Sequence, residues 1–360
     1  IALIFGGMLF TLVRFAEPIF VLFQVPDDVI VIAMAYLSAA SWGLPAVVLY
    51  VTLRYACEGL GQTVLPMLIA GSTLPVNAAL NYVLIYGVFG LPELGGEGCG
   101  WATAITMWFE LSVMLLVIKR PWLLDTGLLD RFDWPRFDPM SSIFRVGVPI
   151  GLTLFLEMTV FALISLLVGS IGVTAIGANT IAGNLNWFVF VIPMSLGSAA
   201  SIRVGFYVGA KDYQAAAQVA RLTIFVSATY AFLAFAVLIL GRDDLPKIYS
   251  SDAEVVALTA DLLLIVACYQ LFDCTQATLI GILRGYKDTK IPMFISWSGY
   301  WLLALPVGLI LGWGLLGPNW GVLGFWVGLG LGVAWIAGFA LLRVIQTSKN
   351  VERIERFAAV

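Results

Sequence analysis

Ten runs of predominantly apolar residues constrain the fold of this chain more than any other feature of its sequence. A helix needs roughly 20 mostly apolar residues to cross the ~30 Å hydrocarbon layer of a bilayer. The period-2 alternation of a membrane β-barrel is missing from the sequence, so helices remain the way to satisfy the backbone in lipid. We therefore expect an all-α polytopic membrane protein. The runs cover approximately residues 1–23, 29–53, 64–87, 99–118, 143–169, 175–202, 218–240, 254–283, 291–312 and 320–345.

The composition supports a membrane protein and argues against several other functions. Hydrophobic residues make up 61% of the 360 residues and charged residues 11%, whereas soluble domains carry about 25% charged residues. A net charge of −3 with no basic stripe argues against nucleic-acid binding. The sequence contains no histidine and no G-x4-G-K-[ST] motif, so ion chemistry must use carboxylates and ATP-driven pumping has no support. We expect no cofactor, only Na+ or H+ as the coupling ion.

The distribution of Lys and Arg predicts the orientation, because positively charged loops are retained in the cytoplasm. Only Arg242 and Lys247 lie in one set of alternate connections. The opposite set, with the tail, is therefore predicted to be cytoplasmic. It holds sixteen cations: Arg54, Lys119, Arg120, Arg131, Arg136, Arg145, Arg203, Lys211, Arg221, Arg284, Lys287, Lys290, Arg343, Lys349, Arg353 and Arg356.

An internal repeat links the two halves of the chain. Residues 58–69, EGLGQTVLPMLI, match residues 284–295, RGYKDTKIPMFI, through a shared G-x3-T-x2-P-M pattern. The pairing continues upstream at an offset of 226 residues. Since the copies lie six spans apart, both cross the membrane in the same direction. This predicts a pseudo-two-fold axis along the membrane normal, with a substrate site between the halves.

The repeat and the loop charges divide the chain into four expected parts. Residues 1–118 form an N-lobe of four spans, 119–142 a cytoplasmic linker, 143–345 a C-lobe of six spans, and 346–360 a cytoplasmic tail. The fifth and sixth spans have no counterpart in the N-lobe. We therefore expect twelve spans in the intact protein, the first two of them absent here.

Acidic residues inside the apolar runs are the strongest candidates for function, since an ionised carboxylate at the bilayer centre costs at least ~2.5 kcal/mol. Glu157 lies in the middle of its run with no basic residue within a helical turn, which makes it a candidate proton carrier or a buried structural acid. Asp273 shares a helix face with Tyr269 and Gln276. Its repeat counterpart is Val47, so the fold itself does not require an acid there.

Other polar and aromatic residues are weaker candidates. Asn77 and Asn81 are four residues apart and could coordinate a cation or bond neighbouring helices. Arg14 and Glu17 are expected to neutralise each other. Several aromatic side chains could form a cavity for large organic cations through their ring faces, or could simply pack. They are Trp42, Trp187, Phe188, Phe272, Trp297, Tyr300 and Trp301, of which Trp187, Phe188 and Phe272, with Gln276, are our candidates for the substrate cavity.

Three stretches resemble the multidrug and toxic compound extrusion (MATE) transporters, and within them the NorM-type bacterial members. They are VGVPIGLTLFLEMTVFALISLLVGSIGVTAIGANTIAG at 146–183, IPMSLGSAASIRVGFYVGA at 192–210 and LRGYKDT at 283–289. The resemblance covers essentially the whole chain. It implies twelve helices in two six-helix lobes, and export of amphipathic, often cationic compounds against entry of Na+ or H+. It also implies a monomer in the bacterial inner membrane.

The resemblance also implies roles for individual residues. Glu157 resembles the family's acidic residue of the seventh helix, Asp273 that of the tenth, and Tyr269 its neighbour in the C-lobe cation site. Asn77 and Asn81 resemble the N-lobe polar pair. The family's first-helix aspartate, partner of that pair, has no counterpart here, so the N-lobe site is expected to be incomplete.

Two alternatives remain open from the sequence. A flippase for lipid-linked saccharides would share this architecture, but its cavity should be rich in Arg, and only Arg14 lies within a run. A membrane-embedded enzyme would show a cluster of metal-binding acids within its helices. Asp27/Asp28 and Asp243/Asp244 lie instead in short loops. We therefore expect a transporter and no enzyme activity.

Overall fold

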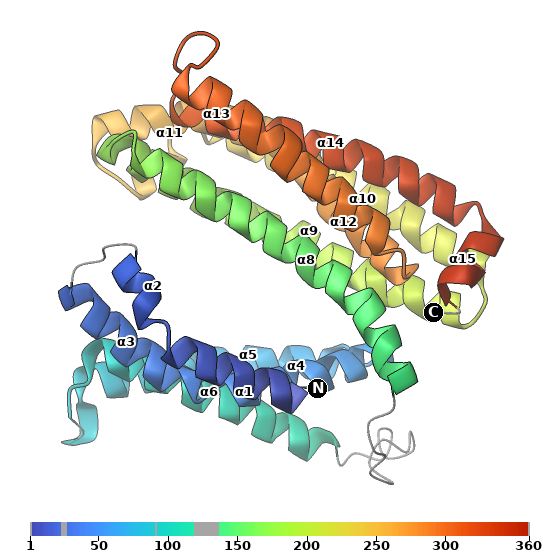
Figure 1. Cartoon of the computed structure of the whole chain (residues 1–360), viewed down its shortest axis with the longest axis horizontal. Coiled ribbons are helices and arrows are strands. Elements are labelled where there is room, and N and C mark those ends of the chain that lie inside the picture. The colour runs from blue at the N-terminus through green and yellow to red at the C-terminus, as the bar shows by residue number, and fades with distance from the viewer. Residues whose placement is uncertain (1, 23–26, 91, 119–136, 359–360) are drawn as a thin grey trace. The chain divides into compact units, whose positions relative to one another are not determined.

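The computed structural model of this chain describes residues 2–22, 27–90, 92–118 and 137–358, and every regular element in those ranges is helical. The chain divides into two compact units, Ile1–Trp134 and Pro135–Val360 (Figure 1). The division falls within the expected linker, 119–142. Residues 119–136 of that linker lie outside the described residues.

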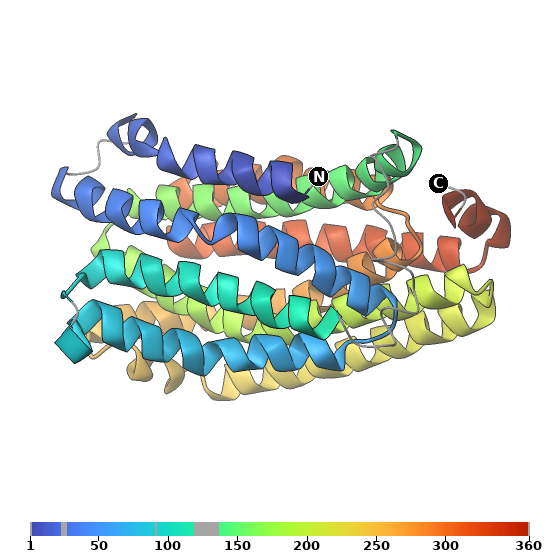
Figure 2. The same cartoon turned by 90° about the horizontal axis from the view of Figure 1, so that it is seen from below.

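Unit 1 is a small helical bundle centred on α6. α6 contacts α3, α4 and α5, and it lies between α4 and α5 (Figure 2). The core includes the buried side chains of Tyr50, Cys57, Ile69 and Met114. The elements are α1 (Ala2–Arg14), α2 (Glu17–Leu22), α3 (Asp27–Ser41), α4 (Leu44–Gly59), α5 (Val64–Tyr86), the 3₁₀ turn η1 (Val88–Gly90) and α6 (Gly95–Ile118).

The second apolar run of unit 1 is a broken span. α3 and α4 are bent by 48° with respect to each other around Trp42 and Gly43. Pro45, in the first turn of α4, has no N–H group to continue the helix hydrogen bonds. A side chain at Gly43 would meet the backbone of Ala104 in α6 at 2.9 Å, so the bend is pressed closely against α6.

The ten predicted runs all correspond to helical segments. Eight single helices are long and apolar enough to span a membrane, and the bent pair α3–α4 makes a ninth, counting the described residues alone. The first run, 1–23, is divided into α1, which has 13 residues, and the short α2. Pro18, near the start of α2, explains why the helix is interrupted there.

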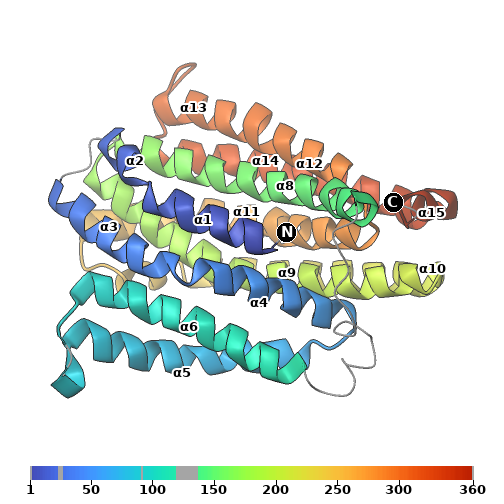
Figure 3. The same ribbon diagram turned by 60° about the horizontal axis from the view of Figure 1, so that its bottom comes forward.

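Unit 2 is built around α11, which contacts α9, α10 and α14. Segments α12, η3 and α13 form one continuous rod along α14 (Figure 3). The elements are α8 (Phe137–Gly169), α9 (Val173–Gly209), α10 (Tyr213–Leu240), the 3₁₀ turn η2 (Leu245–Ile248), α11 (Ala253–Gly285), α12 (Lys290–Trp297), the π-helix η3 (Ser298–Ala304), α13 (Leu305–Trp313), α14 (Val322–Ser348) and α15 (Val351–Ala358).

Two regions outside the expected membrane spans contain helix. α8 begins at Phe137, six residues before the expected start of the fifth span. In the expected tail, 346–360, α14 continues to Ser348 and α15 follows it. Ile354 of α15 is fully buried in a cluster with residues of α9, α10, α11 and α14. Ile354 therefore anchors α15 to the bundle, while most of the neighbouring tail side chains are exposed.

Glycines allow α9 and α11 to approach until their backbones touch. A Cβ atom placed on Gly197 of α9 would lie 2.7 Å from the carbonyl oxygen of Ala277 in α11. A Cβ atom on Gly281 of α11 would overlap the backbone of Gly197. Small residues permit this kind of close helix packing in membranes, where dispersion contacts replace the hydrophobic effect.

The predicted repeat is visible in the helix boundaries. α4 ends at Gly59 and α11 ends at Gly285, whereas α5 begins at Val64 and α12 begins at Lys290. Both pairs of positions are 226 residues apart, the offset found in the sequence. The connections between these helices therefore have the same length in the two copies.

One extra residue distinguishes the second copy from the first. α5 is capped by Gly87 and α13 by Gly314, both in the left-handed conformation, and these positions are 227 residues apart. The additional residue lies in the copy that contains η3. A π-helical turn accommodates one residue more than an α-helix of the same length, and such turns are often found at functional sites.

Candidate functional site

Glu157 of α8 is buried and hydrogen-bonded to the π-helical turn. Its side chain is 8% exposed, and the Tyr300 hydroxyl donates to its Oε1 at 3.0 Å. Trp301, the next residue of η3, donates from Nε1 to the carbonyl oxygen of Leu156 at 3.4 Å. Two adjacent side chains of η3 thus bond the segment of α8 that carries the carboxyl group.

Asp273 and Tyr269 lie one turn apart on α11 and are almost fully buried, at 1% and 2% exposure. The ring of Tyr269 meets that of Trp326 edge-on, with centroids 5.9 Å apart. The Asp273 Oδ1 atom has no hydrogen-bond partner among the residues that the structure describes. A buried polar atom without a partner is costly, so this oxygen is available to a bound ion or ligand.

The two carboxyl groups and the two tyrosine hydroxyls form one electrostatic cluster. Glu157 and Asp273 repel each other when both are ionised, and the hydroxyls of Tyr269 and Tyr300 interact with both acids. Two interacting negative charges in a buried setting are unfavourable. A proton or a cation is therefore expected to accompany this acid pair.

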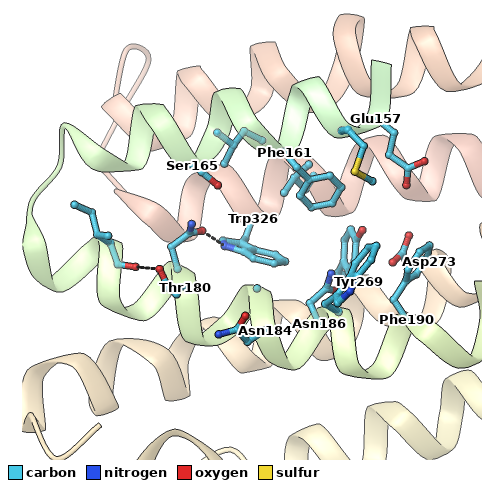
Figure 4. Close-up of a pocket in the computed structure, with 17 residues that line it drawn as sticks. Glu157, Phe161, Ser165, Thr180, Asn184, Asn186, Phe190, Tyr269, Asp273 and Trp326 are labelled. Carbon is cyan, nitrogen blue, oxygen red and sulfur yellow. Dashed lines mark hydrogen bonds between the residues drawn. The ribbon is translucent and has the colours of Figure 1, made fainter. Parts of the chain in front are cut away.

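The acid pair lies at a cavity of about 440 Å³ (Figure 4). Four elements of unit 2 supply its walls: α8, α9, α11 and α14. Figure 4 shows Glu157 and Asp273 toward one end and Ser165 and Thr180 toward the other. The labelled lining residues are Glu157, Phe161, Ser165, Thr180, Asn184, Asn186, Phe190, Tyr269, Asp273 and Trp326.

Amide side chains of α9 contribute polar groups that sequence reasoning missed. Asn179 accepts a hydrogen bond of 3.0 Å from Nε1 of Trp326 in α14. Gln270 of α11 donates to Asn186 Oδ1 at 2.8 Å. The available signal was the spacing of Asn179 and Asn186, which are seven residues apart and therefore share a helix face. An uncharged amide in an apolar run is a weaker signal than an ionisable carboxylate, because it is less costly to bury there.

The cavity includes some of the candidate residues and not others. Glu157, Asp273, Tyr269 and Trp187 line it. Gln276 is 3% exposed but outside the lining, and its Oε1 has no hydrogen-bond partner in the described part of the chain.

Two aromatic candidates point away from the cavity. Phe188 is 80% exposed and Phe272 is 43% exposed, and neither lines the cavity. Phe188 directly follows the lining residue Trp187, and Phe272 directly precedes the lining residue Asp273. A step of one residue turns a side chain about 100° around the helix axis, which carries these two rings off the cavity face.

The amide pair of unit 1 is largely engaged in internal hydrogen bonds. Asn77 donates to Thr106 Oγ1 of α6 at 3.2 Å, and Asn81 donates to Asn77 Oδ1 at 2.9 Å. The Oδ1 atom of Asn81 is buried and finds no partner among the described residues. One amide oxygen of the pair therefore remains available.

The sequence suggests that Arg14 and Glu17 form an ion pair, and this prediction is wrong. The Nε atom of Arg14 donates to Ser41 Oγ at 3.3 Å, and its guanidinium lies 4.6 Å from the ring centroid of Phe10 and 5.1 Å from that of Trp42. α1 ends at Arg14 and α2 begins at Glu17, so the three-residue spacing no longer places both side chains on one helix face.

Replacing Tyr300 with Phe is expected to slow transport several-fold without unfolding the protein. The change removes the hydrogen bond to Glu157, and a bond to a charged group contributes roughly 1.5–3 kcal/mol. Tyr286→Phe is the matched control, because the buried Tyr286 hydroxyl has no partner within the described residues. Drug efflux at equal expression would measure both, and equal rates for the two variants would contradict a positioning role for Tyr300.

Long apolar helices with a buried acid pair at an internal cavity define a polytopic helical membrane transporter. The MatE family model matches residues 1–83 and 149–310. The chain therefore belongs to the MatE family, whose members are transporters rather than enzymes.

Curated relatives agree with this assignment. A probable multidrug resistance protein NorM from Idiomarina loihiensis is 37% identical over 334 residues, which cover 92% of this chain and 72% of the relative. The multidrug resistance protein PmpM from Pseudomonas aeruginosa is 35% identical over 347 residues, covering 95% of this chain and 71% of the relative.

Solved structures share the fold. A crystal structure of a eukaryotic MATE transporter matches with a TM-score of 0.85 at 22% identity, over 99% of this chain and 79% of that chain. The Vibrio cholerae MATE transporter VcmN in its bent form matches with a TM-score of 0.83 at 18% identity, over 98% of this chain and 78% of that one. The expected helical transporter fold is confirmed.

Proposed function

We propose that this protein exports amphipathic, often cationic compounds across the bacterial inner membrane in exchange for Na+ or H+. The observation that carries the proposal is the buried pair of Glu157 and Asp273 at a 440 Å³ cavity, with one carboxylate oxygen lacking a partner among the described residues. The names of the bacterial relatives, multidrug resistance proteins, support drugs as the substrates.

The cavity suits a drug-sized ligand. Its volume lies within the usual range of about 300–1,000 Å³ for small-molecule pockets. Phe161, Trp187, Phe190 and Trp326 contribute aromatic rings to the lining. Ring faces attract organic cations, and the attraction is stronger where water is excluded. Binding therefore needs little directional hydrogen bonding, as expected for a transporter that accepts varied compounds.

Competition for the acid pair supplies the coupling in this proposal. A proton or Na+ neutralises the repulsion between Glu157 and Asp273, and so does a cationic drug. If the site cannot hold a coupling cation and a drug at the same time, binding of the cation releases the drug on one side of the membrane. Release of the cation then prepares the site for the next drug molecule. Alternation between inward- and outward-facing states then produces exchange.

Part of a second cation site in unit 1 belongs to the proposal. Asn77 and Asn81 would contribute to it, and the partnerless Oδ1 of Asn81, judged on the described residues, supports this role. Amide oxygens are suitable ligands for Na+, a hard cation, whereas they do not carry protons.

The proposed orientation places the C-terminal tail in the cytoplasm and the connection between α5 and α6 outside. A single cysteine at Glu93, in a chain whose four native cysteines are replaced, is expected to react with an impermeant maleimide in intact cells. A single cysteine at Lys349 should react only after permeabilisation. Both positions are exposed in the structure. The reverse labelling pattern would invert the proposed topology.

Efflux from proteoliposomes tests the proposed function. The purified protein would be reconstituted with a fluorescent organic cation such as ethidium inside, and the Na+ and pH gradients would be imposed separately. Export driven by one of the two gradients is the expected result. Export that neither gradient accelerates would contradict cation exchange.

A further inference from the structure

A second cavity in unit 2, of about 390 Å³, is lined mainly by cations. It lies where α12 begins and α15 packs, and Figure 1 shows these elements at the same end of the unit. Five of the chain's 19 Lys and Arg residues meet there with one acid. They are Arg145, Lys287, Lys290, Arg343 and Arg356, and the acid is Asp288.

The acid in this cavity is already neutralised. Asp288 is 2% exposed, and its Oδ2 atom forms an ion pair of 2.6 Å with Arg343 Nε. The Thr347 hydroxyl donates to the same oxygen at 3.4 Å. The Arg343 guanidinium also lies 6.0 Å from the ring centroid of Phe357 in α15. This buried ion pair joins the α11–α12 connection to α14, and both of its residues line the cavity. Apart from this pair and Lys287, Arg145, Lys290 and Arg356 add three positive charges, so the lining is predominantly basic.

The first copy of the repeat shows that the fold does not require two of these cations, Lys287 and Lys290. At the 226-residue offset, Gly61 corresponds to Lys287 and Val64 to Lys290. Lys287 has a φ of 59°, a left-handed conformation that costs a lysine steric strain and that Gly61 adopts freely at 80°. The second copy therefore has a lysine where the first has glycine, in a left-handed conformation that Lys211 also adopts at 60°, so the fold itself requires no cation at this position.

The surroundings of the cavity favour a lipid as the source of the anion. Ile143 and Phe144 of α8, next to Arg145, are exposed by 60% and 40%. Lys290 is the first residue of a membrane-spanning segment, so it lies where headgroups would be. Lys and Arg bind phosphate well, and basic pockets between membrane helices are known to bind anionic headgroups.

We propose that this cavity binds the phosphate of an anionic phospholipid such as phosphatidylglycerol, with the acyl chains beside Ile143 and Phe144. A soluble phosphate compound would share the headgroup chemistry but would have no use for the exposed apolar side chains. The site is separate from the Glu157 and Asp273 cavity and does not depend on the proposed transport function.

Native mass spectrometry of the purified protein, titrated with phosphatidylglycerol, tests this proposal. The variant Lys290→Gln/Arg356→Gln removes two lining charges and leaves the buried Asp288–Arg343 pair intact. It is expected to bind the first lipid about tenfold more weakly, because each basic residue near a headgroup contributes appreciably to binding. Lys211→Gln/Lys349→Gln removes two exposed cations that do not line the cavity and should bind like wild type.

Two results would overturn the proposal. Equal lipid binding by the lining variant and by its control would show that this cavity is not the site. Loss of bound phosphatidylglycerol on addition of equimolar inorganic phosphate would make a soluble phosphate the ligand, since an anion without acyl chains would then compete fully. Retention of the lipid under the same conditions is the expected result.

Discussion

Glu157→Gln and Asp273→Asn are each expected to abolish gradient-driven drug efflux while leaving the protein folded. Both replacements keep the shape and hydrogen-bonding capacity of the side chain and remove its titratable charge. Packing around α8 and α11 should therefore survive, and the Tyr300 hydroxyl can still donate to the new amide oxygen at position 157. Only the exchange of cation and drug at the acid pair is lost.

Asp261→Asn is the matched control, because Asp261 lies on the same helix, α11, but is exposed and outside the cavity lining. Efflux from cells at equal expression would be compared for the three variants and the wild type. If the acids had only a structural role, removing an ionisable group from lipid depth should be silent or stabilising. Wild-type efflux by Glu157→Gln and Asp273→Asn would therefore refute their coupling role.

Gly281→Ala is expected to destabilise unit 2 strongly. The new Cβ atom would overlap the backbone of Gly197, and a backbone cannot move aside as the end of a flexible side chain can. Overpacking of this kind typically costs about 1–3 kcal/mol and here requires α9 and α11 to separate. The melting temperature in detergent should fall by roughly 5 °C or more.

Gly338→Ala in α14 is the control for this substitution. A Cβ atom at Gly338 meets nothing within 4 Å, and alanine is the better helix former, so its melting temperature should stay equal or rise. Equal melting temperatures for the two variants would show that the contact between Gly197 and Gly281 does not determine the packing of unit 2.

Most of the helices could be predicted from the sequence, because hydropathy over about 20 residues is a strong physical signal in membranes. The local breaks were harder. The bend at Gly43 depends on how closely α6 approaches, and the division of the first run follows a proline that hydropathy does not detect. The helices of the expected tail and at the start of α8 contain too many polar residues to resemble membrane spans.

The candidate site could be predicted in part for a similar reason. A charged residue in an apolar run is conspicuous, so the sequence predicts Glu157 and Asp273 as site residues, and both line one cavity. Tyr300 could not be paired with Glu157, because they are 143 residues apart and the π-helical turn shifts the side chains that follow it around the axis. Phe188 and Phe272 were chosen by residue type, and residue type does not specify the helix face.

Binding of ethidium as a function of pH and Na+ concentration tests the central claim most directly, since it measures competition at the acid pair without requiring transport. In the wild-type protein, ethidium should bind more tightly as the pH rises, because ionised carboxylates attract the organic cation, and added Na+ or protons should weaken binding. The Glu157→Gln/Asp273→Asn double variant should bind ethidium weakly and almost independently of both cations. Identical pH and Na+ dependence in the wild type and the double variant would contradict the account.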